Sequence, residues 1–137
     1  LETARVDTLV GTGLFDFGGR DGPFELAQLQ HPGGIALLGE GGLLIADTYN
    51  HKLRRVDLSE RRVTTVAGSG EPGPGKGAGE DSLLNEPSGV AVSGDLVLVA
   101  DTNNDRLLRY DAAGGGLTEW KLEWAPADDP APQSPGR

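Results

Sequence analysis

Two segments of the chain repeat each other, and this repeat limits the possible folds more than any other sequence feature. Pro32 is matched by Pro87, and Asp47 is matched by Asp101, at nearly the same spacing along the chain. A period of about 55 residues indicates a propeller or a solenoid, in which each repeat is one supersecondary unit.

Turn residues divide each repeat into four short segments rich in Val, Ile and Leu, and such segments predict β-strands. A ninth segment near the N-terminus resembles the last strand of the first repeat. The predicted strands are Ile35–Leu38, Leu43–Asp47, Lys52–Asp57 and Val63–Ala67, then Val90–Ser93, Leu96–Asp101, Arg106–Asp111 and Leu117–Leu122, with Val6–Val10 as the extra strand.

The second strand of each repeat begins with an unbroken apolar run, Leu43–Ala46 and Leu96–Ala100. A sheet with one wet face would alternate, so both faces of these strands should be covered. A propeller covers them because each four-stranded blade lies between two others. The sequence therefore predicts an all-β fold over residues 1–124, with antiparallel propeller blades at about 30–67 and 85–124 and an extra outer strand at 6–10. Residues 125–137 are rich in Pro and predict a disordered tail.

Charge and composition exclude several functions. The formal net charge of −9 argues against partners that are nucleic acids or anionic membranes. Without Cys there is no disulfide, zinc-thiolate site or cysteine nucleophile, and without Met we expect the chain to be a fragment or a processed product. No apolar run is long enough to span a bilayer and no leader-like segment is present, so we expect a cytoplasmic location.

Acidic and amide residues recur where the second strand of each repeat ends, namely Asp47, Asn50, Asp101 and Asn104. Such residues stabilise turns, and the carboxylates are expected to cap free N–H groups of the hairpin that follows. The alternative is a metal site in which Asp47 and Asp101 converge with His31 and Glu86, which occupy equivalent positions in the two repeats.

Basic and aromatic residues of the third strands and their turns are candidates for a surface that binds a partner. A solvated rim of weak ion pairs is the alternative interpretation. The candidate residues are Arg54, Arg55, Arg106, Arg109, Tyr49 and His51.

The pattern Pro-x-Gly-Ile-Ala, followed by Leu-Leu-Ile-Ala-Asp-Thr-Tyr-Asn-His-Lys-Leu-Arg-Arg-Val-Asp and its partner Val-Leu-Val-Ala-Asp-Thr-Asn-Asn-Asp-Arg-Leu-Leu-Arg-Tyr-Asp, resembles the NHL repeat over roughly 6–124. Flanking residues such as Gly19–Gly22 and Leu84–Gly89 are similar to the last part of the thioredoxin-like, NHL-repeat-containing protein 2 family. This resemblance implies a six-bladed propeller of which the chain carries two blades.

Every repeated residue has an explanation in folding, so we expect a non-catalytic interaction module without a cofactor. The alternative, which the wider six-bladed superfamily resembles, is a metal-dependent lyase or lactonase with an ion in its central channel. Because two blades cannot close a ring, the expected partners are a protein, the remaining blades, or other copies, of which three would restore six blades.

Overall fold

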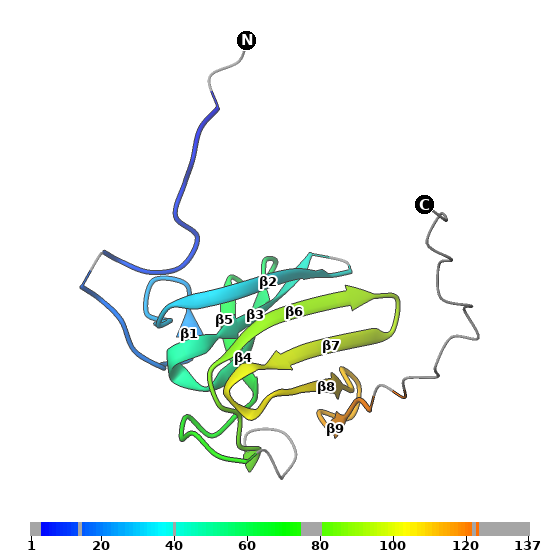
Figure 1. Ribbon diagram of the computed structural model, residues 1–137. Coiled ribbons are helices and arrows are strands. Elements are labelled where there is room, and N and C mark those ends of the chain that lie inside the picture. The colour runs from blue at the N-terminus through cyan, green and yellow to red at the C-terminus, as the bar shows by residue number, and fades with distance from the viewer. Residues whose placement is uncertain (1–3, 14, 40, 75–80, 122, 124–137) are drawn as a thin grey trace, which may run out of the picture.

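The computed structural model describes residues 4–13, 15–39, 41–74, 81–121 and 123, and it contains two antiparallel sheets (Figure 1). The first sheet contains β1 (Gly22–Pro23), β2 (Pro32–Leu38), β3 (Gly42–Asp47), β4 (Lys52–Asp57) and β5 (Arg62–Ala67). The second contains β6 (Pro87–Ser93), β7 (Leu96–Asp101), β8 (Arg106–Tyr110) and β9 (Leu117–Glu119). The 3-10 turns η1 (Thr48–Asn50) and η3 (Thr102–Asn104) join β3 to β4 and β7 to β8.

Consecutive strands pair within each sheet, as expected for blades. The order is β1-β5-β4-β3-β2 in the first and β6-β7-β8-β9 in the second. The pairing of β2 with β3 shifts register between Pro32 and Gly34, and that of β6 with β7 shifts between Pro87 and Gly89. The two repeats therefore share not only their strand order but also the irregularity at the start of each inner strand.

The apolar run of β3 is buried on both faces, as its sequence predicted. Leu44 and Ala46 are fully buried on the side of the second sheet, and Ile45 is 7% exposed on the opposite side. In β7, Val97 and Val99 are buried, whereas Leu98 and Ala100 are only half-buried. Strand β3 of the first blade is thus covered on both faces, whereas β7 of the second blade is buried mainly on the face toward the first.

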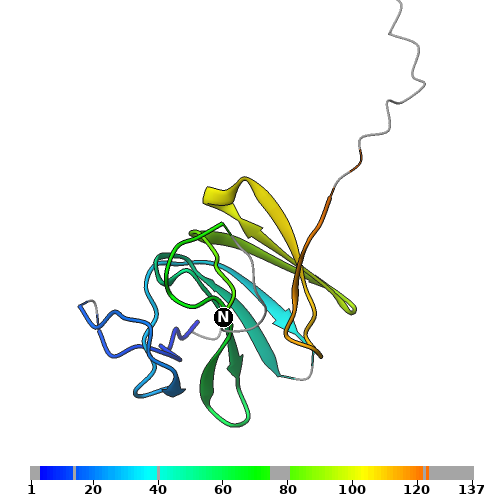
Figure 2. The same ribbon diagram turned by 90° about the horizontal axis from the view of Figure 1, so that it is seen from below.

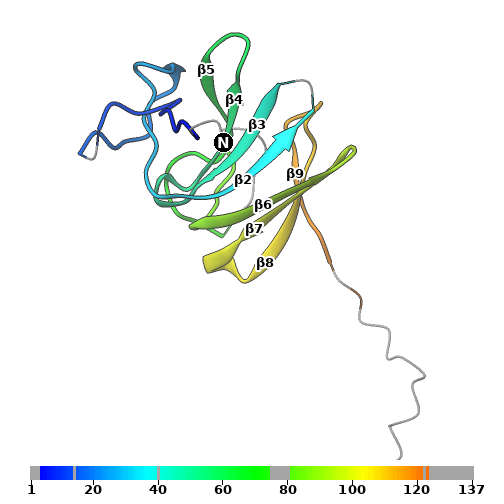
Figure 3. The ribbon, with the colours of Figure 1, turned by 90° about the horizontal axis from the view of Figure 1, so that it is seen from above.

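The core between the blades forms where the two sheets face each other, with β2 and β6 side by side (Figures 1 and 3). Gly34 allows this approach: a Cβ there would lie 2.9 Å from the carbonyl oxygen of Ser88 and from the nitrogen of Val90. The buried cluster takes side chains from both blades, namely Leu44, Leu53, Ala67, Leu84, Val97, Val99, Leu108 and Tyr110.

The outer edges of the blades differ from the prediction. Residues 6–10 form no strand, and the prediction of an extra outer strand there is wrong. An outer strand pairs with the third strand of a blade, and both third strands of the described chain, β4 and β8, already pair with their own outer strands, β5 and β9. β9 ends at Glu119, three residues before its predicted end. The predicted tail, 125–137, lies outside the described residues.

The first blade carries a second apolar cluster on the side away from the second blade. Phe24 and Ala27 pack there against Ile45, Val56 and Val63, so the segment before β2 covers part of this face (Figure 2). Among the described residues, no helix is long and apolar enough to cross a bilayer.

Candidate functional site at the turn end of the blades

The turns after β3 and β7 are copies of each other. η1 and η3 each follow a buried Asp, and each is followed by a residue with left-handed backbone, His51 at φ 51° and Asp105 at φ 50°. The residues before the two prolines, His31 and Glu86, are also left-handed, with φ 49° and 48°. Such conformations are uncommon outside glycine, so the repeat fixes the backbone of this end while its side chains vary.

Asp47 and Asp101 make hydrogen bonds other than the hairpin caps that we expected from the sequence. Neither caps a backbone N–H of its own 3-10 turn. Asp47 instead accepts hydrogen bonds from the N–H of Gln30 (2.7 Å) and the side-chain amide of Asn50 (2.8 Å). Asp101 accepts the equivalent bonds from Asn85 and Asn104, both at 2.7 Å. Each carboxylate therefore ties the loop before the blade to the turn inside it.

The prediction that Arg54 belongs to an exposed surface is wrong, because its side chain is fully buried. Its guanidinium lies 2.7 Å from carboxylate oxygens of both Asp47 and Asp21. It also donates to the carbonyl oxygens of Arg20 (3.0 Å) and Gln28 (3.3 Å). A buried guanidinium needs partners for its donors, and two anions and two carbonyl groups hold its two terminal nitrogens, while its Nε has no hydrogen-bond partner among the described residues.

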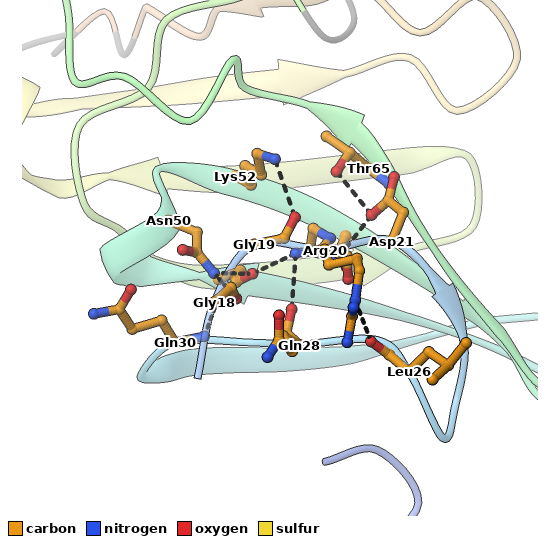
Figure 4. A network of polar contacts seen from close by, with 12 residues as sticks. Gly18, Gly19, Arg20, Asp21, Leu26, Gln28, Gln30, Asn50, Lys52 and Thr65 are labelled. Carbon is orange, nitrogen blue, oxygen red and sulfur yellow. Dashed lines mark hydrogen bonds and ion pairs between the residues drawn. The ribbon is translucent and has the colours of Figure 1, made fainter. Parts of the chain in front are cut away.

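Figure 4 shows how this network joins the loop at 18–21 to the blade. Asp21 accepts hydrogen bonds from the N–H (2.7 Å) and the hydroxyl (3.0 Å) of Thr65 in β5. Asn50 donates to the carbonyl of Gly18, and Lys52 to that of Gly19. Burial raises the pKa of the Asp47 carboxyl, while the hydrogen bonds of Asn50 and Gln30 and the charge of Arg54 lower it in part.

The second blade builds the same ion pair from a different strand position. Arg106, the first residue of β8, lies 2.6 Å from Asp101, with 15% of its side chain exposed. The position equivalent to Arg54 is Leu108, and that equivalent to Arg106 is Lys52. Arg106 is therefore largely withdrawn from the predicted interaction surface.

Arg55 and Arg109 are exposed and occupy equivalent positions of β4 and β8. They lie in different sheets, and Arg55 is 3.9 Å from Asp57 with 53% of its side chain exposed. Of the four arginines of the predicted partner-binding surface, one in each of these two strands is therefore exposed.

The two histidines take separate places at the turn end, and Tyr49 lies beside His31. The rings of His31 and Tyr49 lie 4.4 Å apart at an angle of 36°, and Tyr49 is 50% exposed. His51 instead faces the second blade, where its Nδ1 accepts a hydrogen bond from the N–H of Glu86 (3.0 Å). The four metal candidates do not form a ligand set. Among the described residues, no group of three or more His, Asp or Glu lies close enough together to hold a metal ion.

Exchanging His51 for glycine is expected to cost about 1 kcal/mol more in the free energy of unfolding than exchanging Asp105 for glycine. Both substitutions keep the left-handed backbone, but only the first removes a hydrogen-bond acceptor between the blades. Urea unfolding followed by far-UV circular dichroism measures the difference. Equal losses in the two variants would contradict a stabilising role of the His51 bond.

Known proteins match both the repeats and the fold. The NHL repeat family matches residues 29–55 and 84–110. The chain contains two NHL repeats. It is 39% identical over 105 residues to the Arabidopsis thaliana protein SUPPRESSOR OF QUENCHING 1, chloroplastic, and the match covers 76% of this chain and 10% of that protein. It is 39% identical over 120 residues to the human NHL repeat-containing protein 2, and the match covers 81% of this chain and 16% of that protein.

This NHL-repeat chain thus spans less than a fifth of the length of these curated relatives. A solved structure of a Bacteroides ovatus auxiliary nutrient binding protein superposes with a TM-score of 0.66 at 24% identity, covering 82% of this chain and 28% of that one. A protein of unknown function from Bacteroides thetaiotaomicron gives a TM-score of 0.55 at 24% identity, covering 72% of this chain and 23% of that one. At these identities the similarity concerns the fold alone, and the two sheets are NHL propeller blades.

Proposed function

We propose that this pair of NHL blades is a non-catalytic binding module whose turn end holds a segment of a partner protein. The contact surface is centred on the exposed ring pair of His31 and Tyr49. The single observation that carries the proposal is that this pair is not required by the repeat: the equivalent positions hold Glu86 and Asn103 with the same backbone course.

The chemistry of the pair favours a protein as the partner. Tyrosine is enriched at protein interfaces, where it supplies a large apolar surface together with a polar tip. Small-molecule sites are usually concave, whereas neither ring lines the cavity of about 570 Å³ beside β8 and β9 or the cavity of about 530 Å³ at residues 8–13.

The buried acids support the non-catalytic part of the proposal. Both oxygens of Asp47 are occupied by Gln30, Asn50 and Arg54. Asp101 is occupied by Asn85, Asn104 and Arg106. A general base or a metal ligand needs a free lone pair directed at its substrate or ion, and these carboxylates direct theirs at the fold itself.

The test replaces the ring pair by the residues of the second repeat, His31→Glu with Tyr49→Asn. The free energy of unfolding is expected to change by less than about 0.5 kcal/mol, because these residues already fit the same turn in the second blade. Peptides selected on the unaltered chain from a random-peptide phage library are expected to bind the double variant at least about tenfold more weakly.

Leu58→Ser, on the hairpin between β4 and β5, is the matched control and should leave peptide binding unchanged. Failure of the library to yield any binding peptide would overturn the proposed function. Peptides that bind the double variant as tightly as the unaltered chain would place the binding surface elsewhere.

A further inference from the structure

The contact between the two blades of this chain provides a template for a contact between copies. The first blade presents Leu44, Ala46 and Leu53, all fully buried, toward the second. At the turn end, the hydroxyl of Thr48 donates to the carbonyl of Pro87 (2.8 Å), and His51 accepts from Glu86 (3.0 Å). Apolar side chains and two turn hydrogen bonds therefore hold one blade on the next.

The far face of the second blade repeats this set of groups, and no sheet of the described residues covers it. Leu98, Ala100 and Leu107 are the equivalents of the three buried side chains in the second repeat, and they are only half-buried. Thr102 and Asp105, the equivalents of Thr48 and His51, are exposed. The hydroxyl of Thr102 contacts Ser88 and the Ala100 carbonyl of its own blade.

A cavity of about 570 Å³ marks the position that is filled in the first blade. It is lined by Asp105, Arg106, Leu107, Glu119, Trp120 and Lys121. The equivalent position beside β4 and β5 holds the segment before β6: Ser82 accepts a hydrogen bond from the N–H of Gly68 (2.8 Å), and Leu84 packs with Leu53 and Ala67. The cavity is thus an open counterpart of an occupied site.

The chain itself contains a matching insert. Ala27–His31 is the equivalent of Ser82–Glu86 in the first repeat, and it leads into Pro32 as that segment leads into Pro87. The face behind it is apolar and open, with Ile35 63% and Leu37 74% exposed. Ile35, Leu43 and Ile45 also line a cavity of about 300 Å³ together with Leu9, Val10, Leu29, Val56 and Asp7.

We propose that the far face of the second blade binds the first blade of a second copy of this chain, head to tail. Ala27–His31 of the second copy enters the cavity beside Trp120. Thr102 donates its hydroxyl hydrogen to the carbonyl of Pro32, and the carboxylate of Asp105 accepts the N–H of His31. Because the two faces differ, the contact is heterologous and can repeat from copy to copy until a ring closes.

The test uses the full chain and native mass spectrometry at increasing concentration. Leu98→Glu blocks the far face of the second blade, and Ile35→Glu blocks the open face of the first. Each variant alone is expected to be a monomer at about 100 µM, whereas the unaltered chain forms dimers or larger assemblies. An equal mixture is expected to yield dimers containing one copy of each variant, because one competent face of each kind remains.

Leu58→Glu, which adds the same charge outside both faces, is the control and should assemble as the unaltered chain does. Asp105→Lys is a milder second variant, and it should raise the dissociation constant at least about tenfold if Leu98→Glu does not fold. A monomeric unaltered chain at the highest concentration would overturn the proposal. Self-association of the folded Leu98→Glu variant would also overturn it, since a symmetric contact would then be responsible.

Discussion

Replacing Arg54 by alanine is expected to lower the free energy of unfolding by about 3–5 kcal/mol, the cost of leaving a buried charge without its partner. The substitution leaves Asp47 fully buried and removes the counter-ion that also holds Asp21. It further frees the carbonyl groups of Arg20 and Gln28, so the loop at 18–21 should loosen from the blade. Urea titration monitored by far-UV circular dichroism gives the change.

The neighbouring Arg55→Ala is the matched control, because that side chain is exposed and should change the free energy of unfolding by less than about 0.5 kcal/mol. The double substitution Asp47→Ala with Arg54→Ala should cost less than the sum of the two single ones, since it also removes the fully buried carboxylate that Arg54→Ala alone leaves without a counter-ion. Additive losses would show that Arg54 acts by packing rather than by pairing.

Replacing Gly68 by alanine is expected to cost at least about 3 kcal/mol, because strain and overlap act together. Gly68 has φ 94°, and a Cβ there would lie 2.2 Å from the carbonyl oxygen of His51 and 2.9 Å from the Cα of Lys52. Both obstacles are backbone, so the end of β5 would have to move away from the turn. The same titration measures the loss.

Gly70→Ala separates the two causes. Gly70 has nearly the same backbone, φ 97°, but the nearest atom to its Cβ would be the flexible Cε of Lys52 at 3.3 Å. Only strain should remain, of about 1 kcal/mol. Equal losses at the two positions would mean that the overlap at Gly68 is relieved by a small shift.

The paired strands could be predicted from the sequence because local signals agree with the long-range repeat. Apolar runs, turn residues and the repeat period all place the strands of the two blades in the same order. The segment 6–10 has the same local signal, yet it forms no strand. A strand is defined by its pairing partner, and local composition does not reveal whether one is available.

The burial of Arg54 could have been predicted from the alternation along β4. Arg54 and Val56 share a face, and Val56 is an apolar residue expected to point inward. The pairing of Arg54 with Asp21 could not have been predicted from this alternation. Asp21 lies 33 residues earlier in a glycine-rich loop, and its position against Thr65 is set by the packing of that loop on the finished blade.

Arg54 and Arg106 occupy different strand positions but pair with equivalent carboxylates, and this difference shows how the sequences of the two repeats can diverge. The carboxylate at the end of the second strand needs a cation, but β4 supplies it from its third position and β8 from its first. A strand with arginine at both positions would pair with the same carboxylate. The arginine could therefore change position during evolution through such an intermediate, and the carboxylate would never lack a counter-ion. Column-by-column comparison of repeats would record two unrelated substitutions where a single electrostatic requirement has been kept.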